Sequence, residues 1–156
     1  MKATRKYLEH TADILFQAEA ETLPELFEQC ALAVEESQVD VENFKPKEKV
    51  IITGENNKID LLLFDFLDDL LMYKDSELLM FCKFDIKIEE KMSESEECGE
   101  NNCEGKTIYH LTCTAYGEKI DHEKHDRKVD IKAITLHLFE VKKVEGGWKA
   151  KVLLDI

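Results

Sequence analysis

The run TLPELFEQCALAVEESQ, from Thr22 to Gln38, is the stretch that decides the fold. Its apolar residues Leu23, Leu26, Phe27, Cys30 and Val34 recur at helical spacing, and Thr22 with Glu25 forms a T-x-x-E capping box at the start. A second run, which begins near Asn57, carries a broader apolar face made of Ile59, Leu62, Leu63, Phe66, Leu67 and Leu70. Since each predicted helix has one apolar face to bury, both need a sheet to cover.

Segments of alternating hydrophobicity predict the strands of that sheet. The six candidates are residues 13–20, 49–53, 80–88, 107–116, 129–141 and 148–155. The run Glu145-Gly146-Gly147 separates the last two, and a glycine pair supplies the positive φ angles of a tight hairpin turn. We therefore expect an α+β fold in which two main helices pack on one mixed or antiparallel β-sheet.

The length of 156 residues fits a single domain over residues 1–156, because one core organises roughly 100 to 200 residues. Residues 91–105 contain five glutamates and almost nothing to bury, so they predict an acidic, exposed loop between two strands. Cys98 and Cys103 lie in that loop. A lone C-x4-C lacks the second pair that a structural zinc site needs, so two exposed thiols are the favoured interpretation over a metal site.

The cysteines and the first residues indicate the cellular compartment of the protein. Five cysteines are an odd number in a chain long enough to build its own core, which favours reduced thiols over a disulfide framework. The segment from Met1 to His10 is too polar for a signal peptide, and no run approaches the ~20 apolar residues that span a bilayer. We expect a cytoplasmic protein with no membrane association.

The charge balance limits the possible partners. The chain has 21 basic and 34 acidic residues, a formal net charge of −13. RNA affinity comes largely from Lys and Arg that neutralise backbone phosphates, so this balance disfavours direct RNA binding. We expect any contact with RNA to run through a partner, and a basic protein surface or metal cations to suit this chain better.

Three places could carry chemistry. His10 and Asp13 in the run H-T-A-D could share a metal or hydrogen-bond one another, although such pairs are also common in loops. Asp155 and the terminal carboxylate of Ile156 put two anionic groups on adjacent residues, which suits Ca²⁺ or Mg²⁺, unless the terminus is simply frayed and solvated.

The third place is Lys132, in the predicted strand V-D-I-K-A-I-T-L-H. Strand alternation puts Lys132 on the same face as Ile134, Leu136 and Leu138. One interpretation is snorkelling, with the stem packed and the ammonium in water at the end of the sheet. The other is a cation positioned for a phosphate or carboxylate, and spacing alone does not separate the two.

Seven motifs along the chain resemble those of the archease family, in order and in spacing. They are H-T-A-D at His10 to Asp13, F-E-Q-C-A-L-A at Phe27 to Ala33, L-L-F-D-F-L-D-D-L-L at Leu62 to Leu71, Y-G-E at Tyr116 to Glu118, K-H at Lys124 and His125, V-D-I-K-A-I-T at Val129 to Thr135, and the closing D-I. The resemblance covers almost the whole chain. The chain departs from the family at Leu15, where glycine is usual, at Leu154, where proline is frequent, and in its longer acidic loop.

The resemblance implies a protein cofactor with no enzymatic activity of its own. Archeases assist the GTP-dependent tRNA-splicing RNA ligase, which joins RNA ends bearing a 2′,3′-cyclic phosphate or 3′-phosphate to a 5′-hydroxyl, and they promote its guanylylation and multiple turnover. Carried over by position, the metal-binding cluster for Ca²⁺ or Mg²⁺ falls on Asp13, Asp155 and Ile156, and the essential lysine on Lys132. The first and last predicted strands should then be neighbours, so that Asp13 and Asp155 converge.

Two competing functions remain to be weighed against this one. The first is a chaperone-like acidic binding module for an RNA-modifying enzyme, because an acidic surface can shield a basic protein from aggregation. The second is an enzyme with His10, Asp13 and Lys132 as an acid/base set. The enzyme is disfavoured because the chain has no nucleophile motif, no phosphate-cradling glycine loop and no dense cluster of metal ligands.

Overall fold

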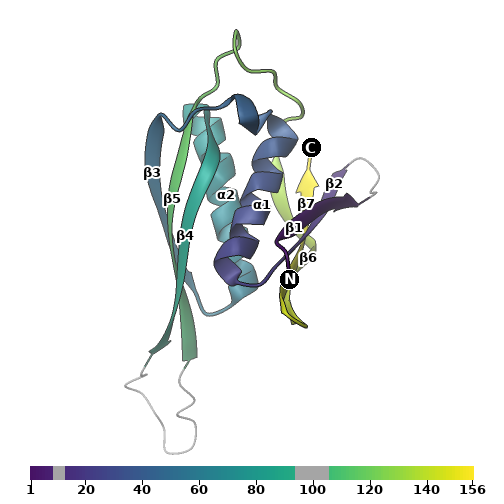
Figure 1. Cartoon of the computed structure of the whole chain (residues 1–156), viewed down its shortest axis with the longest axis vertical. Helices are drawn as coiled ribbons and strands as arrows, with labels where there is room; N and C mark the ends of the chain where they lie inside the picture. The colour runs from purple at the N-terminus through teal and green to yellow at the C-terminus, as the bar shows by residue number, and fades with distance from the viewer. Residues whose placement is uncertain (9–12, 94–105) are drawn as a thin grey trace, which may run out of the picture.

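Two antiparallel sheets enclose two helices in the computed structural model, which describes residues 1–8, 13–93 and 106–156 (Figure 1). The first sheet has the order β1 (Thr4–Leu8), β2 (Asp13–Ala20), β7 (Gly147–Asp155) and β6 (Ala133–Val144). The second has the order β3 (Glu48–Asn56), β5 (Lys106–Lys119) and β4 (Leu79–Ser93). Every strand pairing is antiparallel.

The helices begin and end where local chemistry sets them. Helix α1 spans Leu23–Gln38, and the Thr22 side chain accepts a hydrogen bond from the Glu25 backbone N–H at 3.3 Å, as an N-cap does. Helix α2 spans Ile59–Glu77 and ends at Leu78, which takes a left-handed φ of 55°. A short 3₁₀ helix, η1 (Val41–Asn43), follows α1. No helix among the described residues is long and apolar enough to cross a membrane.

The core lies where the helices meet both sheets. Both helices lie between the sheets, with α1 in contact with β2 and β4 and α2 in contact with β3 and β6 (Figure 1). The rings of Phe27 and Phe66 stack at 6.0 Å and join the helices, while Phe66 meets Phe84 of the second sheet edge to face at 6.3 Å. Each sheet therefore buries one face against the helices and turns its other face away from them.

The sequence-based expectations are confirmed for the α+β class, the two helices and the antiparallel strands, and β2 spans the predicted residues 13–20. The expected single sheet was wrong, since the strands divide into two sheets. Strand β1 was not expected, because its segment Thr4–Leu8 is short and charged and pairs only along the edge of β2. The predicted turn is present, with Gly146 at a φ of +83°.

Two other boundaries differ from expectation. Strand β6 begins at Ala133 instead of Val129, because Asp130 and Ile131 are hydrogen-bonded to side chains of the helices and not to a neighbouring strand. Strand β4 continues to Ser93, so the predicted loop 91–105 begins later than expected. The rest of that acidic loop, with Cys98 and Cys103, lies outside the described residues, as does His10.

Candidate functional site

Two of the predicted ligands lie side by side. Asp13 is the first residue of β2 and Asp155 the last of β7, and the two are direct partners in the antiparallel ladder. Side chains of direct partners project from the same face, with Cβ atoms about 4.5–5.5 Å apart. On its other side Asp155 pairs with Ala133 of β6, whose methyl group leaves room beside the carboxylate. The expectation that the first and last predicted strands are neighbours is confirmed.

These carboxylates project from the face of the first sheet that is turned away from the helices. Phe16 of β2 and Leu154 of β7 are buried in the core with the helices. Because strand side chains alternate, Asp13 and Asp155 project to the opposite face. Ile156 packs partly buried against the core, and the Lys132 backbone N–H donates to the Asp155 carbonyl at 2.7 Å, so the terminus is not frayed.

Lys132 lies immediately before Ala133, its backbone N–H is bonded to Asp155, and its side chain is exposed. The apolar strand face that was expected to continue from Lys132 through Leu136 and Leu138 is not present, although Ile134 is buried in the core. Leu136 is 60 % exposed and Leu138 is 44 % exposed, and the pairing of β6 with β7 is irregular between Thr135 and Glu140. The irregularity breaks the alternation on which that expectation depended.

The segment just before Lys132 is held by a buried lysine that sequence reasoning missed. The Nζ of Lys74, on α2, donates to Asp130 Oδ1 at 2.8 Å and to the Ile131 carbonyl at 2.7 Å. The Lys74 hydrogen bond is the largest cause that keeps the pKa of Asp130 below its usual range. Gln38 of α1 accepts from the Ile131 N–H at 3.4 Å. Both helices thus position the residues that lead into Lys132.

Glu35 is a second buried ionisable residue that the sequence analysis overlooked. It lies on the buried face of α1 and accepts a hydrogen bond from the Phe81 N–H at 2.8 Å. Burial raises the pKa of Glu35 to about 8, opposed by that hydrogen bond and by the charge of Lys74. The signal was available in the sequence, because Glu35 and Lys74 both fall on the apolar faces of their helices.

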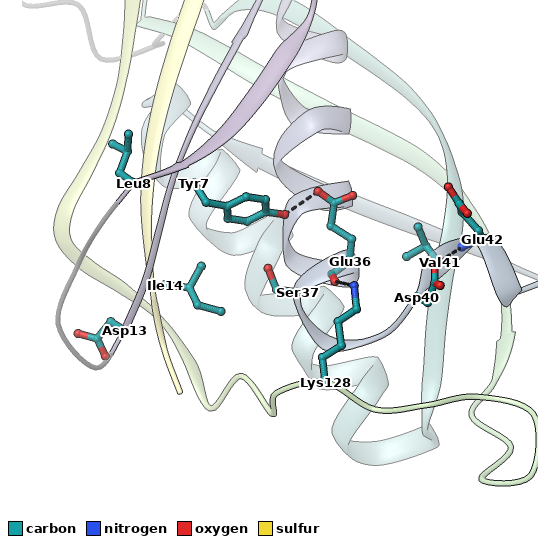
Figure 2. A pocket seen from close by; sticks show the side chains of 10 residues that line it. All are labelled: Tyr7, Leu8, Asp13, Ile14, Glu36, Ser37, Asp40, Val41, Glu42 and Lys128. Atoms are coloured by element: carbon teal, nitrogen blue, oxygen red, sulfur yellow. Dashed lines mark hydrogen bonds between the residues drawn. The ribbon is translucent and has the colours of Figure 1, made fainter.

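A pocket of about 540 Å³ opens beside Asp13, between the ends of β1 and β2 and the end of α1 (Figure 2). Its lining is Tyr7, Leu8, Asp13, Ile14, Glu36, Ser37, Asp40, Val41, Glu42 and Lys128. The Arg5 guanidinium holds the pKa of Glu36 below its usual range through hydrogen bonds at 2.7 and 2.8 Å. The Lys128 Nζ donates to the Glu36 carbonyl at 3.0 Å, so this end of the pocket is internally paired.

Two of the family motifs serve the loop that leads to Lys132. The His125 Nδ1 accepts from the Asp121 N–H at 2.9 Å, so Nε2 carries the proton and faces Glu118 Oε1 at 3.1 Å. The His125 ring stacks on Phe44 at 3.8 Å between ring centres. A Cβ on Gly117 would lie 1.9 Å from the Met80 carbonyl oxygen, which explains the glycine of Y-G-E.

The donor set suits a hard cation better than a soft one. Among the described residues no three His, Cys, Asp or Glu side chains group as a metal site would require. Asp13 and Asp155 provide two carboxylates on one face, next to the terminal carboxylate of Ile156. Mg²⁺ and Ca²⁺ accept such oxygen ligands with water completing the shell, whereas zinc prefers nitrogen and sulfur donors. The residues present fit Ca²⁺ or Mg²⁺.

The chain is similar to proteins of one family. Residues 6–156 match the family model described as the archease protein family. The chain is 38 % identical over 152 residues to the protein archease of Pyrococcus furiosus, with 97 % of each chain covered. It is 32 % identical to Methanobacterium thermoautotrophicum protein 1598, whose solution structure matches with a TM-score of 0.73 over 97 % of this chain and 98 % of that one.

One further solved structure shares the fold. It is that of an archease from Thermotoga maritima, described as a possible chaperone, with 19 % identity and a TM-score of 0.58 over the whole of both chains. At that identity the likeness concerns the fold alone.

Proposed function

Because this chain belongs to the archease family, we propose that it activates a GTP-dependent tRNA-splicing RNA ligase as a protein cofactor and not as an enzyme. The ligase joins RNA ends bearing a 2′,3′-cyclic phosphate or 3′-phosphate to a 5′-hydroxyl. In this proposal the chain promotes guanylylation of the ligase and so restores it for repeated turnover.

The observation that carries the proposal is the row in which Asp155 pairs with Asp13 and receives the Lys132 backbone hydrogen bond. Two carboxylate residues lie at the ends of neighbouring strands, and the backbone of a lysine is bonded to one of them. The Asp155 and Lys132 side chains are exposed, not enclosed in a cleft. An enzyme that acts alone excludes water from its reacting groups, whereas an open set of charges suits insertion into another protein's active site.

Asp13, Asp155 and the terminal carboxylate of Ile156 would hold Ca²⁺ or Mg²⁺, and such an ion supplies positive charge to phosphate oxygens in nucleotidyl transfer. The residues of this chain do the positioning. The hydrogen bond from the Lys132 N–H to the Asp155 carbonyl fixes the Lys132 backbone beside Asp155. Lys132 is then available to a phosphate of the nucleotide or to the carboxylates themselves.

The direct test is the amount of covalent ligase–GMP formed from labelled GTP, with this protein present far below the ligase concentration. We expect it to restore guanylylation catalytically. Asp155→Asn and Lys132→Met should each lose at least about tenfold, the loss of a group worth ~1.4 kcal/mol or more. Glu48→Gln removes an exposed carboxylate from the second sheet and serves as the control. Wild-type protein that leaves guanylylation unchanged would refute the proposal.

The proposed ion is tested on the isolated protein. Calorimetric titration of Ca²⁺ and of Mg²⁺ should show binding that weakens in Asp13→Asn and Asp155→Asn but not in Glu48→Gln. Equal affinity in all four proteins would remove the site from these residues, whatever the ligase assay gives.

A second function is favoured by the acidic composition. The net charge of −13 suits a chaperone-like module that covers a basic RNA-modifying enzyme. Light scattering of the ligase during heating separates the two roles. A chaperone that covers the ligase protects it from aggregation only when the two proteins are present in near equal amounts, and it does not need Asp155. Protection that persists in Asp155→Asn, without any effect on guanylylation, would favour the chaperone.

A further inference from the structure

The face of the first sheet that is turned away from the helices gathers lysines from three strands. Lys6 lies on β1, Lys149 and Lys151 lie on β7, and Lys142 lies on β6. We call these four residues the lysine patch. The register places them in two rows across the sheet, Lys6–Gln17–Lys151–Glu140 and Thr4–Glu19–Lys149–Lys142.

Their common face follows from their neighbours. Ala150 and Val152 of β7 are buried in the core, so Lys149 and Lys151 project to the other side. On β6, Val141 packs against the core and Lys142 follows it. On β1, Arg5 reaches Glu36 of α1, so Lys6 faces away from the helix. Both helices lie on the opposite side of this sheet (Figure 1).

The positive charge of the patch is only partly neutralised. Lys142 forms a salt bridge with Glu140 at 3.0 Å. Within residues 1–8, 13–93 and 106–156, no carboxylate comes within 4.0 Å of the ammonium groups of Lys6, Lys149 or Lys151. Lys142 and Lys149 are direct partners in the ladder, an arrangement of like charges that destabilises a sheet.

The ammonium groups of Lys142, Lys149 and Lys151 all act on one carboxylate, that of Glu140. The pKa of Glu140 is held below its usual range first by the Lys142 hydrogen bond, and also by the charges of Lys151 and Lys149. Lys149 and Lys151 are two positions apart on one strand, about 6.7 Å, and Lys6 lies two strands from Lys151, about 10 Å. A ligand with several anionic groups in a row would contact more than one lysine at once.

The patch also shares its face with the candidate site. Asp155 projects from the same side of β7, four positions beyond Lys151, or about 13 Å along the strand. A chain-like anion that ends at the Asp13–Asp155 row would therefore pass over the lysines.

We propose that the lysine patch binds the phosphodiester backbone of RNA. The inference rests on the proposed function, because the ligase's substrate supplies the polyanion that reaches this face. The net charge of −13 describes the whole chain, while contact with phosphates depends on the local charges, here four lysines beside Glu19 and Glu140. RNA contact is thus direct at this face, in contrast to the expectation from composition.

The test compares two triple variants of equal charge change. Lys6→Gln/Lys149→Gln/Lys151→Gln removes three charges from the patch and keeps most of each aliphatic stem. The control, Lys49→Gln/Lys87→Gln/Lys119→Gln, removes three charges from exposed lysines of the second sheet. The probe is a short, fluorescein-labelled single-stranded RNA, and fluorescence anisotropy measures its binding across a range of potassium chloride concentrations.

We expect the patch variant to bind RNA at least about tenfold more weakly than wild type. The slope of log K against log salt should fall by about 2, since each lost phosphate contact removes about 0.7 on single-stranded nucleic acid. The control should lose little. Equal weakening in both variants, or wild-type protein that prefers polyglutamate or phosphatidylserine vesicles to RNA, would overturn the proposal.

Guanylylation measured without RNA separates this inference from the function on which it rests. The patch variant should stimulate guanylylation as wild type does, because its three lysines lie outside the carboxylate row. Wild-type protein that stimulates guanylylation but binds no RNA refutes the patch alone. Wild-type protein that binds RNA through the patch but never stimulates guanylylation refutes the proposed function alone.

Discussion

Replacing Lys74 with methionine removes the buried ammonium group and keeps most of the side-chain volume. Lys74 is 2 % exposed at its side chain, and its ammonium donates to the Ile131 carbonyl at 2.7 Å and to Asp130 at 2.8 Å. Methionine is similar in length and apolar, so Lys74→Met leaves little cavity. The change removes the two hydrogen bonds that hold the backbone just before Lys132.

The size of the effect follows from which partner is buried. Ile131 is fully buried, and a buried carbonyl left without its donor costs about 1–3 kcal/mol. The Asp130 side chain is 61 % exposed, so water replaces its partner and adds little. A loss of about 2 kcal/mol in the free energy of unfolding corresponds to a Tm about 4–8 °C lower for a chain of this length.

The assay joins thermal denaturation, followed by circular dichroism, with ligase guanylylation at a temperature below both melting transitions. We expect Lys74→Met to melt lower and to stimulate poorly while folded, because the segment before Lys132 is released. Asp75→Asn is the matched control, since Asp75 meets the same ammonium at 3.3 Å but is 64 % exposed. The reasoning fails if Lys74→Met melts as wild type does, or if it melts lower yet stimulates fully.

Three further changes have distinct outcomes. Lys132→Met should keep a near-native Tm, because the side chain is exposed, and should abolish stimulation of the ligase; normal stimulation would mean that the cation is not required. Burial raises the pKa of Glu35 from 4.5 to about 8, so the folded chain keeps a proton that the unfolded chain releases within that window. Stability should therefore fall as pH rises across it, by up to ~1.4 kcal/mol per pH unit, and urea titrations of Glu35→Gln should show a flatter profile. Gly117→Ala should destabilise by at least ~2 kcal/mol, because its Cβ would lie 1.9 Å from the Met80 carbonyl oxygen, whereas Gly54→Ala meets only the end of a leucine side chain at 3.4 Å and should melt near wild type.

The sequence predicted elements whose signals are local. Thr22 is followed by apolar residues at helical spacing, and α1 begins at Leu23 as that pattern indicates. Alternation over residues 13–20 gave the bounds of β2, and the glycine pair gave the turn at Gly146. Each of these signals depends on neighbours within about one or two turns of chain, so no distant residue is needed to read it.

The candidate site was only half accessible from the sequence. Resemblance to a family pointed to Asp13, Asp155 and Lys132. The sequence pattern around Lys132 was misleading, because the alternation assumed a regular strand where β6 has an irregularity and begins at Ala133. The support from Lys74 had a visible signal, a charged residue on an apolar helix face, but its partners lie more than fifty residues away.

The tertiary structure decided what lies next to what. Which strands pair is set by the burial of both helices between two sheets, and that is a property of the whole chain. The pairing of β2 with β7 brings Asp13 opposite Asp155 from the two ends of the sequence, and the pairing of β1 with β2 brings Lys6 into the row of Lys151. Composition and periodicity determined an acidic α+β chain, whereas the meeting of these charges on one face required the fold, because contacts between distant strands leave no periodic trace in the sequence.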